Sequence, residues 1–197
     1  MSNGNWDMTL IGTAFILGLE GIKGFHPSTS DSLRWVSWIT NFGRYTCLYC
    51  AEQNGKIYEK DNPPDPEPEV HPNCHCILDT MLSIIAGTAT IEGTSGADYY
   101  CKYYNTLPDN YVSKKYAISR EWRAIKGNLR KVLPNAIIGG DIYKNFDGRL
   151  PQARGRIWYE ADINYTGGYR NTHRVVYSND GLVFVTYDHY LHFYPIE

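Results

Sequence analysis

The chain has 197 residues, of which 43% are hydrophobic and 14% aromatic, and this composition excludes an intrinsically disordered protein. The net charge of −2 is unevenly divided, because residues 1–101 carry 5 Lys/Arg and 12 Asp/Glu whereas residues 102–197 carry 14 and 9. An acidic half followed by a basic half favours two modules, of which the second is suited to a polyanion.

The longest apolar stretch is "MTLIGTAFILGLEGI", residues 8–22. It is shorter than the roughly 18–20 residues of a membrane span, and Glu20 interrupts it. Asp7, with no basic residue before it, is the wrong flank for a secretory signal. The stretch therefore predicts a buried or partner-facing helix and no membrane span, so that any export uses a route without an N-terminal signal peptide.

The next segment, "SDSLRWVSWITNF" at residues 30–42, is interpreted as a second helix. Ser30 or Asp31 is its expected N-cap, and its apolar residues fall at helical spacing (Leu33, Val36, Trp38 and Ile39). Its tryptophans are expected in a core.

Residues 46–76 hold a cysteine box at each end of a Pro-rich acidic loop, which can form neither a helix nor a central strand. Cys47 and Cys50 form a C-x-x-C pair, and "HPNCHC" follows at residues 71–76. The spacing leaves two alternatives, a structural zinc site and a pair of disulfides. Zinc is favoured, because a disulfide between Cys74 and Cys76 would be strained, although crossed pairs to the first two cysteines would not be.

The stretch from "RWVSWITNFGRYTCLYC" to "HPNCHC" resembles the C-terminal part of phage minor head proteins of the Mu F type. The resemblance implies a small zinc-stapled module. Its implied ligands are Cys47, Cys50, Cys74 and Cys76, with His71 as a substitute for one of them.

From about residue 88 the pattern indicates helices and then strands. Ala97, Tyr100, Cys101 and Tyr104 form the stripe of an amphipathic helix ending before "LPDN", with Cys101 as a small core residue. A helix capped by Ser113 is expected to run through Trp122, and a short one to follow Asn128.

"RIWYEADINY", "HRVVYS" and "LVFVTYDHYLHFYPI" are separated by turn sequences and predict an antiparallel meander. The expected fold class is α+β, with helices packed on a C-terminal antiparallel sheet and the Cys/His-rich module in front of it.

Strand alternation suggests a site on this sheet. One face of the first strand carries Arg156, Glu160 and Asp162 and is expected to be the open face. Arg170 and Arg174 share a face on the next strand, and His189 ends the one after it. A ladder of salt bridges is the simpler interpretation of the charges alone. A carboxylate, an imidazole and guanidiniums are, however, also what cleavage of RNA by its own 2′-OH requires, without a metal.

"LPDNYVSK", "KGNL", "IGGDIY", "EADINYTGGYRN" and "YDHY" occur in this order, and the chain from residue 88 onward resembles the barnase-type guanyl-specific ribonucleases. The resemblance implies that Glu160 is the general base and His189 the general acid. Arg170 and Lys114 would stabilise the transition state, and Arg174 would bind the scissile phosphate while pairing with Asp162.

Guanine recognition in this family uses the loop that reads "YKNFDGR" here. Asn145 fits the family, Asp147 replaces the usual glutamate, and Phe146 stands where an arginine is expected and is suited to stack on a base. Tyr190 would line the substrate side of the cleft, and Arg156 is a further expected substrate contact. His173 and Gly181 also depart from the family prototype, at positions that are not catalytic.

These observations predict a phage-head-like module at residues 1–87 and a ribonuclease domain at 88–197. The expected protein is a toxin or effector that cleaves single-stranded RNA after guanosine, delivered by secretion or by a phage-like or secretion-system particle. A barstar-like inhibitor is implied, which would protect a cytoplasmic producer. Two alternatives are a structural or RNA-binding head protein with an inactive ribonuclease fold, and self-inhibition by the acidic run "EKDNPPDPEPE".

Overall fold

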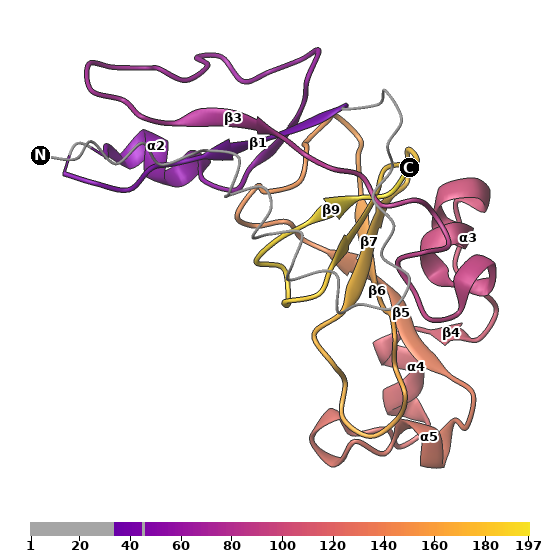
Figure 1. The fold of residues 1–197 in the computed structure, drawn as a ribbon. Coiled ribbons are helices and arrows are strands. Elements are labelled where there is room, and N and C mark those ends of the chain that lie inside the picture. The colour runs from indigo at the N-terminus through magenta and orange to yellow at the C-terminus, as the bar shows by residue number, and fades with distance from the viewer. Residues whose placement is uncertain (1–33, 45) are drawn as a thin grey trace, which may run out of the picture.

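The computed structural model describes residues 34–44 and 46–197, and the expected helix at residues 8–22 lies outside them. Figure 1 shows an N-terminal sheet at one end of the molecule and the helices α4 and α5 at the other. No helix in these two ranges has the length and apolar character to cross a bilayer. The elements are β1 (Trp35–Ile39), α2 (Leu48–Gln53), β2 (Ile57–Glu59), β3 (Ile77–Thr80), η1 (Gly93–Ser95), α3 (Ala97–Tyr104), β4 (Tyr111–Val112), α4 (Lys114–Ser119), η2 (Ala124–Lys126), α5 (Leu129–Val132), β5 (Ile137–Tyr143), β6 (Trp158–Asp162), β7 (Arg174–Ser178), β8 (Val183–Thr186) and β9 (Tyr194–Pro195).

The strands form two sheets. The first has the order β2-β1-β3 and is antiparallel. The second has the order β4-β5-β6-β7-β8-β9 and is antiparallel except for the parallel β4–β5 pair. The mixed α+β class and the predicted meander are confirmed, and "LVFVTYDHYLHFYPI" contributes two strands, β8 and β9, rather than one.

The helix predicted for residues 30–42 is wrong, because Trp35–Ile39 is a strand. β1 is the central strand of the first sheet, and the two faces of its sheet pack on different cores. Trp35 lies in a core with Phe184, whereas Trp38 packs among the cysteines. Apolar residues on both faces of a buried strand produce a spacing that resembles a helical stripe. Both tryptophans are buried, as expected.

The helices of the second half follow the sequence signals closely. α3 covers the predicted stripe, and Cys101 is fully buried in the core that α3 forms against the second sheet. The Ser113 side chain accepts a hydrogen bond from the Tyr116 N–H and so caps α4. α4 ends at Ser119 rather than at Trp122, and Trp122 is buried beside the sheet. α5 begins directly after Asn128.

The first sheet shares a hydrophobic core with the second. Trp35 and Ile57 pack with Trp158, Val176 and Phe184, and the Trp35 and Phe184 rings meet edge to face at 5.1 Å. Backbone hydrogen bonds between residues 84–86 and 195–197 add to this contact. The first sheet is therefore packed against the second sheet rather than linked to it by a flexible tether.

Candidate active site

A β-bulge in β5 creates the local geometry of the site. The register between β5 and β6 shifts between Gly139 and Asp141, and the intervening Gly140 has a φ of +84°, which favours glycine. A Cβ on Gly139 would lie 2.5 Å from the Cβ of Ala161, so the neighbouring strand leaves no room for a side chain there. The bulge places Asp141 opposite Glu160, at the first turn of α4.

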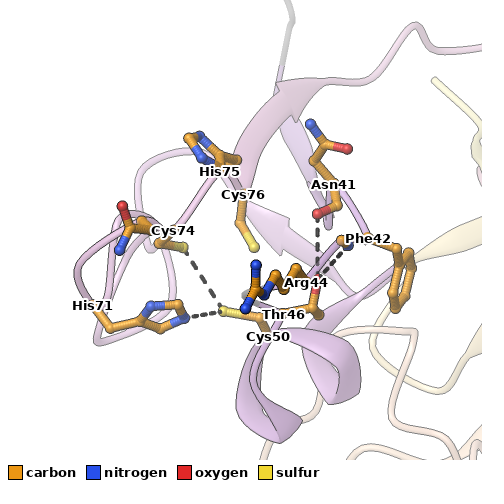
Figure 2. Close-up of a pocket in the computed structure, with 11 residues that line it drawn as sticks. Asn41, Phe42, Arg44, Thr46, Cys50, His71, Cys74, His75 and Cys76 are labelled. Atoms are coloured by element: carbon orange, nitrogen blue, oxygen red, sulfur yellow. Dashed lines mark hydrogen bonds between the residues drawn. The ribbon is translucent and has the colours of Figure 1, made fainter.

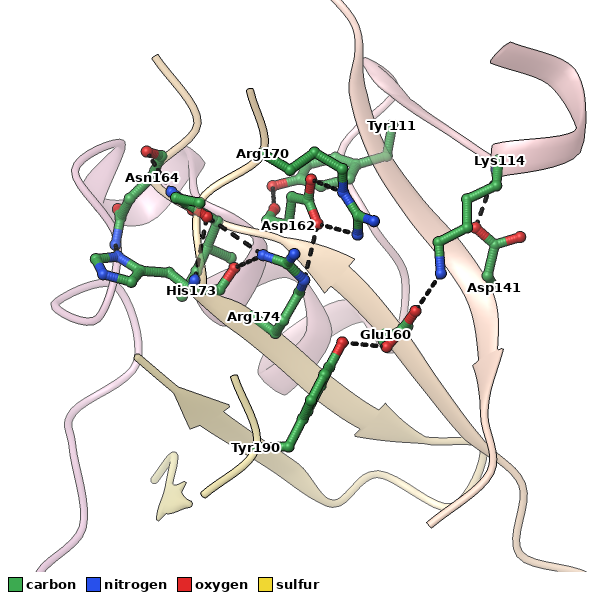
Figure 3. A network of polar contacts seen from close by, with 12 residues as sticks. Tyr111, Lys114, Asp141, Glu160, Asp162, Asn164, Arg170, His173, Arg174 and Tyr190 are labelled. Carbon is green, nitrogen blue, oxygen red and sulfur yellow. Dashed lines mark hydrogen bonds and ion pairs between the residues drawn. The ribbon is translucent and has the colours of Figure 1, made fainter. Parts of the chain in front are cut away.

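Asp141 was not identified from the sequence, although it lies inside the "IGGDIY" motif. Its carboxylate accepts the backbone N–H of Lys114 at 2.9 Å. This bond fixes the start of α4 against β5 (Figure 3). The helix N-terminus is thus satisfied by a side chain of the protein itself, and the Lys114 ammonium points to Glu160.

The carboxylate of Glu160 lies between two hydrogen-bond donors, Lys114 and Tyr190, as Figure 3 shows. Lys114 Nζ forms an ion pair with Oε1, and the Tyr190 hydroxyl donates to Oε2. Burial by itself raises the pKa of Glu160, but these two hydrogen bonds, with the charges of Lys114 and Arg170, outweigh it and the net pKa is lowered. Glu160 is therefore ionised at neutral pH, as a general base requires.

Asp162 binds both arginines of the site. The Arg170 guanidinium donates to both carboxylate oxygens at 2.7 Å, and Arg174 Nε lies 3.0 Å from Oδ1 in an ion pair. Arg174 also donates to the carbonyl of His173 and to Asn171 Oδ1. Asp162 is fully buried, so it serves as the anchor that orients the two guanidiniums. The expected Asp162–Arg174 pair is present, with Arg170 added to it.

His189 reaches the site from a loop and not from the strand that was expected to carry it. β8 ends at Thr186, and Val183 and Val185 face the core on the other side of the sheet from Glu160. His189 and Tyr190 have φ values of +59° and +71°, and this turn brings them into the cleft. Strand alternation therefore could not have placed the histidine.

A cleft of about 420 Å³ opens above Glu160, between the loop after β5 and the loop after β8. Asn145, Phe146, Asp147, His189 and Tyr190, all expected to bind substrate or act in catalysis, line it together with Ile142, Tyr143, Lys144, Arg149 and Leu191.

Within that loop the residues differ in role. The Asn145 side chain is buried and holds both backbone groups of Leu150, so it shapes the loop from behind. Phe146 is 89% exposed at the rim, where a flat ring is accessible to a base. Arg149 was not identified from the sequence; it pairs with Asp147 at 3.1 Å and donates to the Leu191 carbonyl. Arg149 thus ties the two walls of the cleft together.

The face of β6 that carries Glu160 and Asp162 was expected to be open, and this expectation is wrong. Glu160 is only 8% exposed and Asp162 is 0% exposed. Trp158 on the same face lies in the core shared with the first sheet, which covers this end of the strand. Arg156 does not line the cleft, since Asp180 and the Pro151 carbonyl hold its guanidinium.

The two positions that depart from the prototype lie away from Glu160. His173 contacts Asn164 through Nδ1 at 3.3 Å, and burial together with Arg174 lowers its pKa. Gly181 occupies a turn between β7 and β8 with a φ of +93°.

The charges around Glu160 and Asp162 are balanced. Lys114, Arg170 and Arg174 supply three positive charges, and Glu160, Asp162 and the neighbouring Asp141 supply three negative charges. The N–H groups of the three cations are nevertheless of the kind that binds phosphate oxygens. The arrangement therefore combines an ionised carboxylate, an imidazole and clustered cations, which is more than a salt-bridge ladder provides.

The acidic run does not enter this cleft. Glu67, Pro68 and Glu69 line a shallow hollow against Cys76–Leu78 of the first module. The described contacts thus give no support to self-inhibition by this segment.

All five expected zinc donors lie together at the far side of the first sheet. Cys47, Cys50 and His71 form one close group, and Cys50, Cys74 and Cys76 form another. All five cysteines of the described chain are free thiols.

Comparison with known proteins identifies the second module. A family model described as ribonuclease matches residues 94–197. Ribonucleases of Bacillus intermedius and Bacillus pumilus are each 50% identical to this chain over 117 residues, which cover 59% of this chain and 72% of the relative. A ribonuclease of Heyndrickxia coagulans is 50% identical over 109 residues, which cover 55% of this chain and 100% of the relative. The chain belongs to this ribonuclease family.

The residues that the family model matches begin at residue 94 and include every residue that lines the cleft. The chain is therefore an RNA-cleaving enzyme, an endoribonuclease. The same matches support the resemblance to barnase-type ribonucleases. The cysteine cluster and the first sheet precede the matched residues, and the resemblance to phage head proteins stays a prediction.

Proposed function

We propose that the ribonuclease domain cleaves single-stranded RNA by transesterification, with Glu160 as base and His189 as acid. Glu160 takes the proton of the 2′-OH, whose oxygen attacks phosphorus, and His189 gives a proton to the departing 5′-oxygen. Lys114, Arg170 and Arg174 stabilise the charge that develops on the phosphoryl oxygens. The products are a 2′,3′-cyclic phosphate, later hydrolysed to a 3′-phosphate, and a 5′-hydroxyl end.

The observation that carries this proposal is that Glu160 and His189 line one cleft while three cations surround the carboxylates beneath it. Side chains supply the base, the acid and the charge stabilisation, so catalysis is proposed to need no cofactor. Guanosine on the 5′ side of the cut is the proposed preference, through backbone N–H groups and Asp147 of the loop at residues 144–149. Phe146 contributes stacking on the base.

The experiment is mass spectrometry of the products of a short RNA with a single guanosine, incubated with the full-length protein and a chelator. We expect a fragment ending in guanosine 2′,3′-cyclic phosphate to appear first. Cleavage elsewhere would contradict the base preference, and 5′-phosphate products would contradict the mechanism. No cleavage by the folded protein would favour the inactive, RNA-binding head protein instead.

We further propose that the enzyme acts as a toxin or effector, with residues 1–87 as the delivery or packaging adaptor and a barstar-like protein as its inhibitor. The excess of 14 Lys/Arg over 9 Asp/Glu in residues 102–197 supports an acidic inhibitor. Expression of wild type should stop growth of a host lacking such an inhibitor, whereas Glu160→Ala should be tolerated. Equal growth of both strains, with equal protein levels, would contradict the toxin role.

A further inference from the structure

Two segments about twenty residues apart bring four cysteines and a histidine of the kinds that bind zinc close together. Figure 2 shows four of these side chains, Cys50, His71, Cys74 and Cys76. The ligand atoms of Cys47, Cys50 and His71 lie within 4.8 Å of one another, and so do those of Cys50, Cys74 and Cys76. Cys50 belongs to both groups and is therefore their centre. None of these residues contributes to the ribonuclease cleft.

Two separations measured from Cys50 match those between ligands of one ion. Cys50 Sγ lies 3.4 Å from His71 Nε2 and 3.8 Å from Cys74 Sγ. Ligands of a tetrahedral zinc, with Zn–S of about 2.3 Å and Zn–N of about 2.0 Å, are separated by roughly 3.5 to 3.8 Å. A disulfide requires about 2.05 Å between sulfurs, far less than the separation found.

Two donor pairs with the same spacing face each other. Cys47 precedes α2, and its sulfur accepts the N–H of Cys50 at 3.4 Å, so both side chains lie on one turn. The second pair is a tight turn as well, because the Cys74 N–H donates to the His71 carbonyl at 3.0 Å. His71 Nδ1 is held by the Pro72 carbonyl at 2.9 Å, which leaves Nε2 directed at the sulfur. Such a backbone contact orients metal-ligating histidines.

Cys76 lies close to Cys50 and Cys74 but has a further partner. Its sulfur donates to Thr40 Oγ1 at 3.8 Å, and Thr40 in turn donates to the Cys50 carbonyl at 2.6 Å. Three thiolates and one zinc ion leave a single negative charge, and Arg44 lines the same small cavity. The surroundings thus fit three thiolates and an imidazole better than four thiolates.

We propose that Cys47, Cys50, His71 and Cys74 bind one zinc ion, with Cys76 beside it and hydrogen-bonded to Thr40. This ligand set exchanges His71 for the Cys76 that the sequence favoured. The site is closed by four protein donors and is structural rather than catalytic.

The ion would hold both ends of the Pro-rich loop together. The core beside it consists of Trp38 and the cysteines with a few partly buried neighbours, too small to fix the loop without a cross-link. The chain then leaves α2 for Ile57, whose N–H donates to the Arg149 carbonyl at 2.8 Å. The zinc site therefore supports the segment that contacts one wall of the cleft.

Metal content and Co²⁺ substitution of the full-length protein test this proposal. We expect one zinc per chain, and after exchange an absorption spectrum with tetrahedral Co²⁺ bands and thiolate charge transfer. Cys50→Ser and His71→Ala should lose the stoichiometric ion. Cys76→Ala and His75→Ala should keep it, and the exposed His75 is the matched control because it lies between two of the cysteines.

If Cys50→Ser or His71→Ala does not fold, His71→Cys still tests the ligand set. This variant should bind Co²⁺ with stronger thiolate charge transfer than wild type. Loss of the ion in Cys76→Ala with retention in His71→Ala would overturn the ligand set. A folded wild type without bound metal, or one with a single titratable thiol in the absence of reductant, would overturn the site. RNA cleavage is not a readout here, so failure of this proposal is distinct from failure of the proposed function.

Discussion

Lys114 and Glu160, 46 residues apart in the sequence, form an ion pair between the first turn of α4 and the middle of β6. The bulge at Gly140 and the Asp141 carboxylate set the position of the lysine backbone. The pair therefore depends on strand geometry as much as on charge. It determines how readily the proposed base ionises.

Lys114→Ala should move the acid limb of the kcat/KM profile to higher pH. Burial raises the pKa of Glu160 while Lys114, Tyr190 and Arg170 lower it, so removal of the lysine lets burial act more strongly. The base then stays protonated to a higher pH, and activity is lost earlier on acidification. We also expect kcat/KM on the plateau to fall by roughly 10²- to 10³-fold, because a cation at the phosphate is lost.

Lys115→Ala is the matched control, since it removes an equal charge from the next, exposed position. Its acid limb should coincide with that of wild type. An acid limb that does not move in Lys114→Ala would show that the ion pair does not set the ionisation of Glu160.

Asp162→Asn should destabilise the protein by about 3–5 kcal/mol, because it leaves two guanidiniums without their buried counter-charge. Chemical denaturation measures this change, with the exposed Asp109→Asn as control. Equal stability of the two variants would show that Asp162 does not anchor Arg170 and Arg174.

Phe146→Ala should raise KM for RNA with little change in kcat. Aromatic stacking contributes roughly 1–3 kcal/mol per base, which corresponds to roughly 5- to 150-fold in affinity. Steady-state kinetics on a short RNA check this, with Ile125→Ala as the control because Ile125 is 83% exposed outside the cleft lining. An unchanged KM would remove Phe146 from substrate binding.

Trp35→Ala should lower the stability of the ribonuclease domain, although Trp35 precedes the residues that the family model matches. The side chain is 2% exposed in the shared core, and such truncations cost about 3–5 kcal/mol. The effect is measured as the midpoint temperature of unfolding, with residual RNA cleavage as the signal. Leu48→Ala is the control, because Leu48 is 83% exposed. Identical midpoints would mean that the first sheet does not support the domain.

The sequence was sufficient for features that rest on local patterns. The stripe of α3 and the Ser113 cap each follow from residues within one element. The expectation that Arg170 and Arg174 share a strand face was wrong, because β7 begins at Arg174 and Arg170 lies in the loop before it. The cysteines and His71 around Cys50 lie close together as expected, because C-x-x-C and "HPNCHC" are short motifs, and their binding of zinc stays a prediction.

Features that depend on tertiary contacts were missed. β1 is covered by two different cores, so its hydrophobic spacing does not reveal a strand. The burial of Glu160 accompanies contacts with Lys114 and Tyr190 from other segments, which alternation within β6 cannot show. His189 enters the cleft through positive φ angles, and Asp141 reaches the start of α4 through a bulge. Neither the turn at His189 nor the bulge before Asp141 can be recognised from the hydrophobic periodicity of the sequence.

The most direct test of the central claim compares Glu160→Ala and His189→Ala on two substrates, a guanosine-containing RNA and the 4-nitrophenyl ester of guanosine 3′-phosphate. Nitrophenolate leaves without protonation, so the acid is dispensable for the ester but the base is not. We predict that Glu160→Ala loses roughly 10²- to 10⁴-fold on both substrates, whereas His189→Ala suffers such a loss on RNA alone. Equal losses for His189→Ala on both substrates, or unimpaired cleavage of the ester by Glu160→Ala, would contradict the assignment of acid and base.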